Sequence, residues 1–327
     1  MFWQHYRWQS YLLKPFSWLY GLAFKIIHYF IVPQHLCLPS ITIGNFVIGG
    51  GGKTPIVRAV SNILQQMTGK KPAILMRGYG RHHHQNIRVD TAHHNACDVG
   101  DEAIMLGRDF SVYVGYKRHI SALYARKDGF EIAICDDGLQ SLHFKSHLNI
   151  AVIDGHYGFG NEQLLPAGPL RISLKDGLKK IDAVILVNED VQQCVFKIKK
   201  LKPDIAIFYA TIDCNQKDLA ILKNQKIIAF CGIARAKKFE KTLQQNHLNI
   251  LDFKSYGDHY IYRRKDIEAL RIKAKSLGAK LLTTEKDLSR LANSDLDVSD
   301  IFQLRIDARF LEGSTPALKH WINEQLR

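Results

Sequence analysis

The chain has 327 residues, of which 46% are hydrophobic, so it can bury the core of one large α/β unit or of two smaller ones. Its formal net charge of +14 indicates an anionic partner, such as a nucleic acid, a phospholipid surface or a phosphorylated substrate. The six cysteines include no CxxC pair, which argues against a disulfide framework and is typical of reduced, buried thiols in a cytosolic protein.

Residues 2–32 are rich in aromatic and aliphatic side chains. The polar or small residues among them recur every three or four positions and would form one narrow stripe on a helix: Gln4, Arg7, Ser10, Lys14, Ser17, Gly21, Lys25 and His28. A membrane span over residues 16–32 is one interpretation, but Lys25 and His28 interrupt it, and the positive charges upstream would place the rest of the chain outside. We expect a helix that lies in the cytoplasmic interface of a membrane. The alternative is an amphipathic helix that packs on the protein's own core.

Residues 41–48 are apolar and β-branched, which predicts a buried strand, and a helical pattern begins at Pro55. The segment between them is a GGxGKT-type phosphate loop. Its glycines allow backbone N–H groups to converge on phosphate oxygens, its lysine reaches the β- and γ-phosphates, and its threonine hydroxyl is a Mg²⁺ ligand. The longer GxxxxGK[ST] form does not fit, because position 47 is Val47. A tight turn without a ligand is the alternative. The predicted nucleotide-binding residues are Gly49, Gly50, Gly51, Gly52, Lys53, Thr54 and Pro55.

A helix over residues 56–67 and a strand over residues 72–76 follow, and the strand ends at Arg77. Five histidines lie beyond it, at positions 82–84, 93 and 94. No cysteine or acidic residue shares their spacing, so we expect a surface loop there in preference to a metal site. Asp101 and Glu102 open the next predicted helix, where acidic residues serve as caps or, after a glycine, in catalysis.

Residues 131–140 predict a strand that ends in Asp136 and Asp137, typical of the acidic strand end that handles Mg²⁺ in P-loop enzymes. A plain Asp-Asp-Gly turn is the alternative. Further strands are predicted at residues 111–115, 148–154, 183–187, 205–209, 226–231 and 280–284. A proline- and glycine-rich segment places Arg171 on a loop. Strands that alternate with helices predict a doubly wound, mainly parallel sheet of the P-loop NTPase kind.

Together these motifs resemble one family, the lipid A 4′-kinases, also called tetraacyldisaccharide 4′-kinases. The ordered set covers nearly the whole chain and is far more specific than any single motif. The matching segments are residues 44–45, 49–54, 77–80, 100–102, 136–140, 165–171, 231–235, 258–259 with Tyr262, and 283–287.

The resemblance implies a kinase that depends on ATP and Mg²⁺ and phosphorylates the 4′-hydroxyl of a tetraacyl glucosamine disaccharide 1-phosphate in lipid A synthesis. The anionic glycolipid would be met at the cytoplasmic face of the bacterial inner membrane by a peripheral or monotopic protein, with no nucleic acid and no obligate protein partner. The implied fold has two α/β/α domains joined by a short β linker. We expect an N-terminal membrane-associated segment at residues 1–38, a P-loop domain at 39–215 and a second, smaller α/β domain at 216–327.

Residue roles follow from this interpretation. Lys53 and the loop amides are assigned to the donor phosphates, and Thr54 with Asp136 to Mg²⁺. Asp101 and His259 are the candidate general bases, because a carboxylate raises the basicity of an imidazole. Asp137 is a further catalytic candidate. The candidate contacts to substrate or transition-state phosphate are Arg77, Glu102, Arg118 and Arg171.

The chain departs from the family at two positions. Gly51 occupies a position in the phosphate loop that is usually not glycine, which makes the loop more flexible but removes no donor. Ile172 stands where the family commonly has a glutamate, so no metal or nucleotide role of that glutamate is carried over.

Two other classes of function compete. A P-loop GTPase or metallochaperone shares the glycine loop, but no Asn/Thr-Lys-x-Asp segment for reading guanine is evident. A structural or nucleic-acid-binding protein would use the positive charge alone, but the basic residues are dispersed and not interleaved with stacking aromatics.

Overall fold

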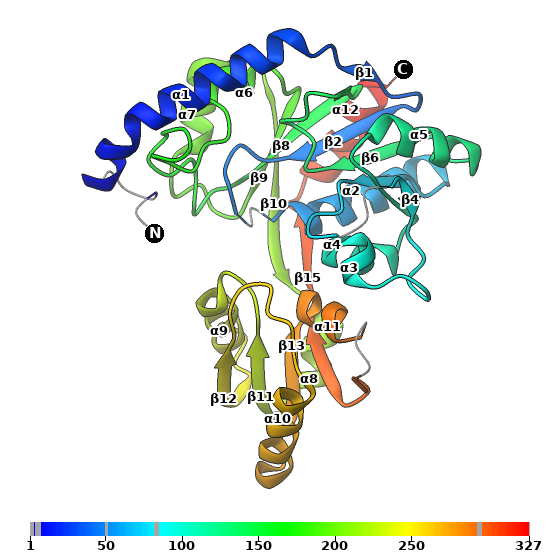
Figure 1. Ribbon diagram of the computed structural model, residues 1–327, viewed down its shortest axis with the longest axis vertical. Helices are drawn as coiled ribbons and strands as arrows, with labels where there is room; N and C mark the ends of the chain where they lie inside the picture. The colour runs from blue at the N-terminus through cyan, green and yellow to red at the C-terminus, as the bar shows by residue number, and fades with distance from the viewer. Residues whose placement is uncertain (1–2, 4–7, 50–51, 82–84, 293–295, 327) are drawn as a thin grey trace.

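The computed structural model describes residue 3 and residues 8–49, 52–81, 85–292 and 296–326. Within these residues the chain forms a larger α/β unit that carries a long N-terminal helix, and a smaller α/β unit joined to it by two neighbouring strands (Figure 1).

The helices of the larger unit are α1 (Trp8–Phe30), α2 (Lys53–Thr68), α3 (Ala96–Val99), α4 (Asp101–Gly107), α5 (Arg118–Lys127), α6 (Leu174–Leu178), α7 (Cys194–Leu201) and α12 (Ser314–Gln325). Its strands are β1 (Gln34–His35), β2 (Ser40–Gly44), β3 (Ala73–Met76), β4 (Ile87–Arg88), β5 (Val112–Val114), β6 (Ala133–Asp136), β7 (Phe144–Lys145), β8 (Leu148–Asp154), β9 (Ala183–Val187), β10 (Ala206–Cys214) and β15 (Ile306–Phe310). The smaller unit contains α8 (Gln216–Leu222), β11 (Lys226–Cys231), α9 (Ala236–Gln245), β12 (Asn249–Ser255), α10 (Arg264–Leu277), β13 (Lys280–Thr284), α11 (Glu285–Leu291) and β14 (Ile301–Leu304).

Nine of the described strands of the larger unit form one sheet in the order β15-β10-β9-β8-β2-β6-β3-β5-β4, and β1 pairs parallel with β7 in a separate two-stranded sheet. In the nine-stranded sheet the edge strand β15 pairs antiparallel with β10, the edge strand β4 pairs antiparallel with β5, and all other neighbours pair parallel. From β2 the sheet is built outward in both directions, through β6, β3 and β5 on one side and β8, β9 and β10 on the other. This reversal makes the sheet doubly wound and confirms the predicted fold class.

The central strands are buried on both faces, because their alternate side chains meet helices on opposite sides. In β8, Ile150 and Val152 pack in the core that the apolar stripe of α2 and residues of α12 complete. Ala151 and Ile153 face the other way and pack with residues of α6 and α7. The predicted helical stripe of residues 56–64 is therefore one wall of the main core.

The segment after β2 differs from its prediction. The strand ends at Gly44 instead of residue 48, because the following backbone bonds to the proline- and glycine-rich segment: Ile48 N–H donates to Pro169 O, and Arg171 N–H donates to Phe46 O. Helix α2 begins at Lys53, two residues before the predicted start. Gly52 precedes it with a φ of 76°, a left-handed conformation that favours glycine.

The smaller unit is built on a parallel sheet of order β12-β11-β13-β14. The chain enters it at the end of β10 and returns along β15, which pairs antiparallel with β10 from Ala210↔Phe310 to Cys214↔Ile306. These two strands lie between the units (Figure 1). We propose that the first domain boundary lies at residues 215–216 and that a second lies near residue 305, since β15 and α12 pack on the larger unit.

Helix α1 is amphipathic, and part of its polar stripe packs on the protein, whereas Lys25 of the same stripe is exposed. Ser17 is buried, donates through Oγ to Leu164 O (2.8 Å) and accepts from Ala167 N–H (3.0 Å). Ser10 is also buried and accepts a hydrogen bond from Asn161 Nδ2 (3.0 Å). Gly21 and Tyr20 continue the contact: a Cβ on Gly21 would lie 3.0 Å from a side-chain carbon of the same segment, and Tyr20 Oη donates to a backbone carbonyl there.

The opposite face of α1 is exposed. Its large exposed side chains are Trp8, Tyr11, Leu12, Phe16, Trp18, Leu19, Leu22, Ile26, Ile27, Tyr29 and Phe30. Helix α1 therefore docks on the protein, as the alternative proposed, but through part of its polar stripe, and its apolar face stays exposed. Among the described residues, no helix is long and apolar enough to cross a membrane.

Candidate active site

The predicted site residues gather at the carboxyl edge of the large sheet. Strands β2 and β6 are parallel neighbours with Ile43 opposite Asp136, so the glycine loop after β2 and the acidic end of β6 emerge side by side. In open α/β sheets this edge, next to the point where strand order reverses, is where ligands bind. The start of α4 and residues of the smaller unit close the site from the other side.

Lys53 is held by two acceptors at the start of α2. Its Nζ donates to Asn45 Oδ1 (3.2 Å) and forms an ion pair with Asp137 Oδ2 (3.5 Å). Gln140 Nε2 donates to Asn45 O (2.6 Å), which ties the loop after β2 to the loop after β6. Gly49 has a φ of 109° that suits a glycine, and Thr54 and Pro55 lie in the first turn of α2. Gly50 and Gly51 lie outside the described residues.

Arg171 reaches Asp137 from the loop predicted for it. Its Nη1 lies 3.0 Å from both carboxylate oxygens. Burial by itself raises the pKa of Asp137, but Lys53 and Arg171 outweigh burial and hold that pKa below its ordinary value. Asp137 is therefore an ionised carboxylate that keeps two cations at the mouth of the glycine loop. Its φ of 50° is uncommon for a non-glycine residue and places its side chain there.

Asp136 is a candidate metal ligand. Its carboxylate is buried, and Oδ1 has no hydrogen-bond partner among the described residues. Burial and the negative charge of Glu102 raise its pKa to about 7, even though Lys53 acts in the opposite direction. A divalent cation would satisfy this orphaned oxygen and restore the charged form, so the donor set fits Mg²⁺. The effect of Glu102 on Asp136 also shows that α4 and the end of β6 border the same site.

The structure brings Asp101 and His259 together from different units. Asp101 Oδ2 lies 3.3 Å from His259 Nδ1, whereas the neighbouring Asp258 Oδ1 lies 4.0 Å from Nε2. Arg290 Nε donates to the same Asp101 oxygen (2.6 Å), and its Nη2 lies 3.3 Å from His259 Nδ1. His259 has a φ of 55°, and its backbone N–H donates to Gly232 O.

Arg290 was missed by the sequence analysis, although it anchors this pair. Its Nη1 donates to Gly232 O (2.8 Å) and to Asp287 Oδ1 (3.0 Å). Asp287 is fully buried and also accepts from Tyr262 Oη (3.0 Å). Thr284 Oγ1 accepts from the backbone N–H of Asp287 (3.1 Å) and caps α11. Asp287 therefore takes part in the cap of α11 and also supports Arg290.

The remaining predicted substrate residues occupy different environments. Glu102 Oε1 pairs with Lys286 Nζ (3.3 Å) across the two units. The guanidinium of Arg77 lies over the ring of Tyr116, 5.1 Å from its centroid. Arg118 is buried, donates to the backbone oxygen of Asp136 (3.1 Å), and has its pKa lowered by burial. It therefore supports the end of β6, which carries Asp136.

A second set of ion pairs joins the units beside the site. Arg58 of α2 and Glu285 of α11 are both buried and form a two-point pair, with Nη1 2.8 Å from Oε2 and Nη2 2.5 Å from Oε1. Arg305 adds contacts to Glu285 (3.3 Å) and to Asp109 (2.8 Å). No local pattern predicts these pairs, because Arg58 and Glu285 are 227 positions apart in the chain and Arg305 and Asp109 are 196 positions apart.

The histidine-rich segment shows no metal geometry in its described part. His93 pairs with Asp90 (2.8 Å), and the Nδ1 of His94 accepts from the backbone of the same residue (3.0 Å). The described residues contain no group of three or more His, Cys, Asp or Glu side chains that could hold a metal. Residues 82–84 lie outside the described part of the chain.

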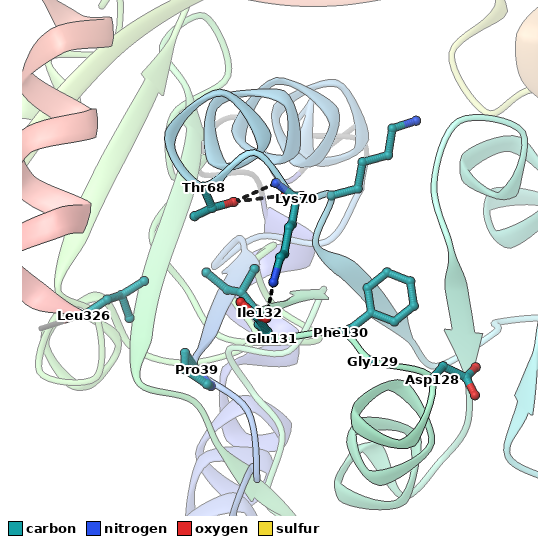
Figure 2. Close-up of a pocket in the computed structure, with 10 residues that line it drawn as sticks. Pro39, Thr68, Lys70, Asp128, Gly129, Phe130, Glu131, Ile132 and Leu326 are labelled. Atoms are coloured by element: carbon teal, nitrogen blue, oxygen red, sulfur yellow. Dashed lines mark hydrogen bonds and ion pairs between the residues drawn. The ribbon is translucent and has the colours of Figure 1, made fainter.

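A cavity of about 480 Å³ lies at the opposite edge of the sheet (Figure 2). Pro39 and Ile132, which immediately precede β2 and β6, line it together with Leu326. Figure 2 shows Lys70 on one wall, bonded to Thr68 and Glu131. Because this cavity is at the amino ends of the strands, it is separate from the glycine loop.

The doubly wound sheet, the glycine loop with its lysine and the acidic strand end together define a P-loop phosphotransferase. The sequence profile of the tetraacyldisaccharide-1-P 4′-kinases matches residues 9–327. The chain belongs to this family, and it is a kinase.

Individual relatives agree with this assignment. A tetraacyldisaccharide 4′-kinase of Bradyrhizobium sp. strain BTAi1 is 36% identical over 293 residues, which cover 89% of this chain and 84% of that protein. The enzyme of the same name from Parvibaculum lavamentivorans is 33% identical and covers 96% and 92%. A crystal structure of LpxK from Aquifex aeolicus, described as an apo form in complex with ATP, has 25% sequence identity and a TM-score of 0.77, and it covers 97% of this chain and 99% of that one.

The unusual Ile172 is accounted for by its surroundings. Its side chain is buried in the core formed by residues of β8, β9, α6 and α7. An isoleucine there contributes apolar contact and offers no ligand to a metal or nucleotide.

Proposed function

We propose that this kinase transfers the γ-phosphate of ATP to the 4′-hydroxyl of a tetraacyl glucosamine disaccharide 1-phosphate in lipid A synthesis. The observation that carries the proposal is the Asp101–His259 pair, which the smaller unit completes at the edge of the sheet that holds Lys53 and Asp136. The family match and the ATP complex of the Aquifex aeolicus relative support the choice of donor.

In this reaction the acceptor oxygen forms a bond to the γ-phosphorus, and the bond from that phosphorus to the β–γ bridging oxygen breaks. ADP leaves with the electron pair of the broken bond. The hydroxyl proton passes to the His259 imidazole, whose developing charge Asp101 stabilises at 3.3 Å. Arg290 holds Asp101 in place, so His259 keeps its orientation as the proton is transferred.

The donor is held by the larger unit. When the donor binds, Lys53 Nζ leaves its contacts with Asp137 and Asn45 and binds phosphate oxygens instead. The backbone amides of the glycine loop donate further hydrogen bonds to the phosphates. Asp136 and Thr54 are proposed to hold Mg²⁺, which would supply charge neutralisation at the β- and γ-phosphates when bound. Arg171 and Asp137 are proposed to keep the acceptor side of the site ordered, with Arg77 and Glu102 as further contacts to the substrate.

The acceptor is proposed to arrive from a membrane. The exposed apolar face of α1 suits the acyl region of a lipid surface, and the net charge of +14 suits an anionic headgroup. We propose peripheral association with the cytoplasmic face of the inner membrane, where ATP is present, with no nucleic acid and no obligate protein partner.

The test is transfer of label from γ-labelled ATP to a tetraacyl disaccharide 1-phosphate in detergent micelles. Label in the lipid, at the 4′ position, is the expected result. Label that appears only as free phosphate, with an active control kinase, would contradict the proposed acceptor. Competition by unlabelled ATP but not GTP is expected and would separate this function from that of a P-loop GTPase.

A further inference from the structure

The loop that opens α9 reaches from the smaller unit to the larger one. Helices α9 and α11 lie at the end of the smaller unit that is nearer the large sheet (Figure 1). Arg235 is the residue that precedes α9, and its guanidinium carbon lies 4.9 Å from the ring centroid of Tyr157, in the turn after β8. Lys238, in the first turn of α9, lies 3.9 Å from Asp154 at the end of β8. The start of α9 therefore contacts the larger unit at the end of β8.

The guanidinium of Arg235 also lies next to the glycine loop. A Cβ built on Gly49 would be 3.4 Å from Arg235 Nη2, which is ordinary van der Waals contact. Gly49 is the first glycine of the loop assigned to the donor phosphates. The arginine therefore borders the phosphate site from the side opposite Asp136, because β8 and β6 flank β2 on its two sides.

Arg235 has no hydrogen bond or ion pair to a carboxylate within the described part of the chain. It is half-buried and carries five N–H donors, and its guanidinium lies over the Tyr157 ring, a contact that uses none of these donors. Three other arginines at the site are paired with carboxylates: Arg171 with Asp137, Arg290 with Asp101 and Asp287, and Arg58 with Glu285. Arg77 lies over the Tyr116 ring but is exposed, whereas Arg235 is half-buried. An ordered guanidinium with open donors beside a phosphate loop has the chemistry of an anion contact.

We propose that Arg235, on the smaller unit, binds the polyphosphate chain of the donor nucleotide, and that Tyr157 positions the guanidinium of Arg235. This inference rests on the proposed function for the identity of the donor site. Arg235 donates hydrogen bonds to phosphate oxygens and exchanges no proton, so the bonds made and broken are those of the transfer described above. Because the arginine is on the smaller unit, nucleotide binding would draw that unit towards the glycine loop.

The proposal is tested on the full-length chain with the variants Arg235→Ala, Arg235→Lys, Tyr157→Leu and Tyr157→Phe. Lys237→Ala is the matched control, since Lys237 is an exposed cation two positions further along. Equilibrium binding is measured for ATP, ADP and adenosine, and kcat and KM are measured with the labelled lipid assay. Thermal midpoints without nucleotide report whether each variant is folded.

Arg235→Ala is expected to weaken ATP binding by roughly 10- to 100-fold and to leave adenosine binding unchanged, as for loss of charge-assisted hydrogen bonds to phosphate. Arg235→Lys should recover only part of the affinity, because an ammonium lacks the planar fork and its stacking. Tyr157→Leu should weaken ATP binding by about 3- to 10-fold, whereas Tyr157→Phe keeps the ring and should stay within about twofold. The control Lys237→Ala should also stay within about twofold.

Unchanged ATP affinity and kcat/KM in Arg235→Ala would overturn the proposal, as would equal losses for ATP and adenosine. If Arg235→Ala does not fold, Arg235→Lys decides in its place, and weaker ATP binding at an unchanged thermal midpoint is then required. ATP binding needs no lipid. Arg235-dependent ATP binding in a protein that labels no disaccharide would contradict the proposed acceptor and leave this inference standing.

Discussion

At the residue scale, the site depends on carboxylates placed in contrasting environments. Asp136 and Asp137 are adjacent, yet one is buried without a cation and the other touches Lys53 and Arg171. The pKa of Asp136 is raised to about 7, and the pKa of Asp137 is lowered. Asp136 is therefore the candidate metal ligand, and Asp137 pairs with two cations.

The raised pKa of Asp136 predicts a stability penalty in the metal-free protein. The unfolded chain loses this proton near pH 4, whereas the folded protein keeps it up to about pH 7, so stability should fall as pH rises through this window. Asp136→Asn cannot ionise. We expect it to stabilise the protein by about 1–3 kcal/mol at pH 8 and by much less at pH 4.5.

Urea unfolding with EDTA at the two pH values measures this difference. Asp137→Asn is the matched comparison, and it should destabilise at pH 8 because it removes the partner of two cations. A variant Asp136→Asn that is less stable than the parent at pH 8 would contradict the interpretation.

The Asp101–His259 pair predicts a loss of rate with little loss of donor binding. His259→Ala should lower kcat by roughly 10²- to 10⁴-fold, as for removal of a general base, with ATP KM within about threefold. Asp101→Asn should also lower kcat and keeps the size of the side chain beside Arg290. Asp258→Ala is the control, because Asp258 is farther from the imidazole and exposed. Wild-type kcat in both His259→Ala and Asp101→Asn would remove the pair from the mechanism.

At the scale of single elements, α1 shows how one sequence pattern permits two opposite placements. The three- and four-residue spacing predicts a helix with a narrow polar stripe and a wide apolar face. Either face can be the one that packs. The hydroxyls of Ser10 and Ser17 determine which face packs, because they form hydrogen bonds with residues of the segment that ends at Arg171. The aromatic face then remains exposed.

The exposed face of α1 predicts a specific effect of charged substitutions. Trp18→Asp with Leu22→Asp should lower binding to vesicles that contain anionic phospholipid by more than tenfold, since each large apolar side chain contributes about 1.5–3 kcal/mol when buried. Sedimentation with the vesicles measures this binding. Ile272→Asp replaces an exposed apolar residue on α10 and is the control. Equal vesicle binding by the double variant and the parent would contradict the prediction.

At the scale of the whole molecule, the active site is a junction between two units. The buried Arg58–Glu285 pair, the Arg290–Asp101 pair and the Lys286–Glu102 pair all connect the larger unit to α11. Approach of the units is what completes the Asp101–His259 pair. The ion pairs at this junction therefore contribute to stability and also fix the position of the Asp101–His259 pair.

The junction predicts coupling between its two buried charges. Arg58→Met or Glu285→Leu alone should lower the free energy of unfolding by up to about 3–5 kcal/mol. Each removes the two-point partner of a buried charge and leaves it only a single-point partner, Arg305 for Glu285 and Asp109 for Arg58. The double variant should lose less than the sum of the two single losses. Urea unfolding of the four proteins gives the coupling energy. Arg271→Met with Asp300→Leu breaks an exposed pair of similar geometry and should cost about 1 kcal/mol or less. Additive losses at Arg58 and Glu285 would show that the pair does not couple the units.

Local sequence determined the parts of this protein whose physics is local. Apolar runs with β-branched residues predicted the central strands, and helical spacing predicted α2. The glycine loop and the acidic end of β6 could be recognised as candidate sites because phosphate and Mg²⁺ require particular atoms close together in the chain, and the roles of their residues stay predictions.

Tertiary structure decided what depends on contacts between distant residues. It brought Arg290 to Asp101, Glu285 to Arg58 and Arg235 to Tyr157, which no spacing along the chain encodes. Tertiary contacts also place β15 and α12 on the larger unit, and they bring Ser17 of α1 into contact with Leu164. The physical reason is the same in each case: burial and pairing energies depend on which partner the fold supplies, whereas propensity and spacing depend only on the neighbours in sequence.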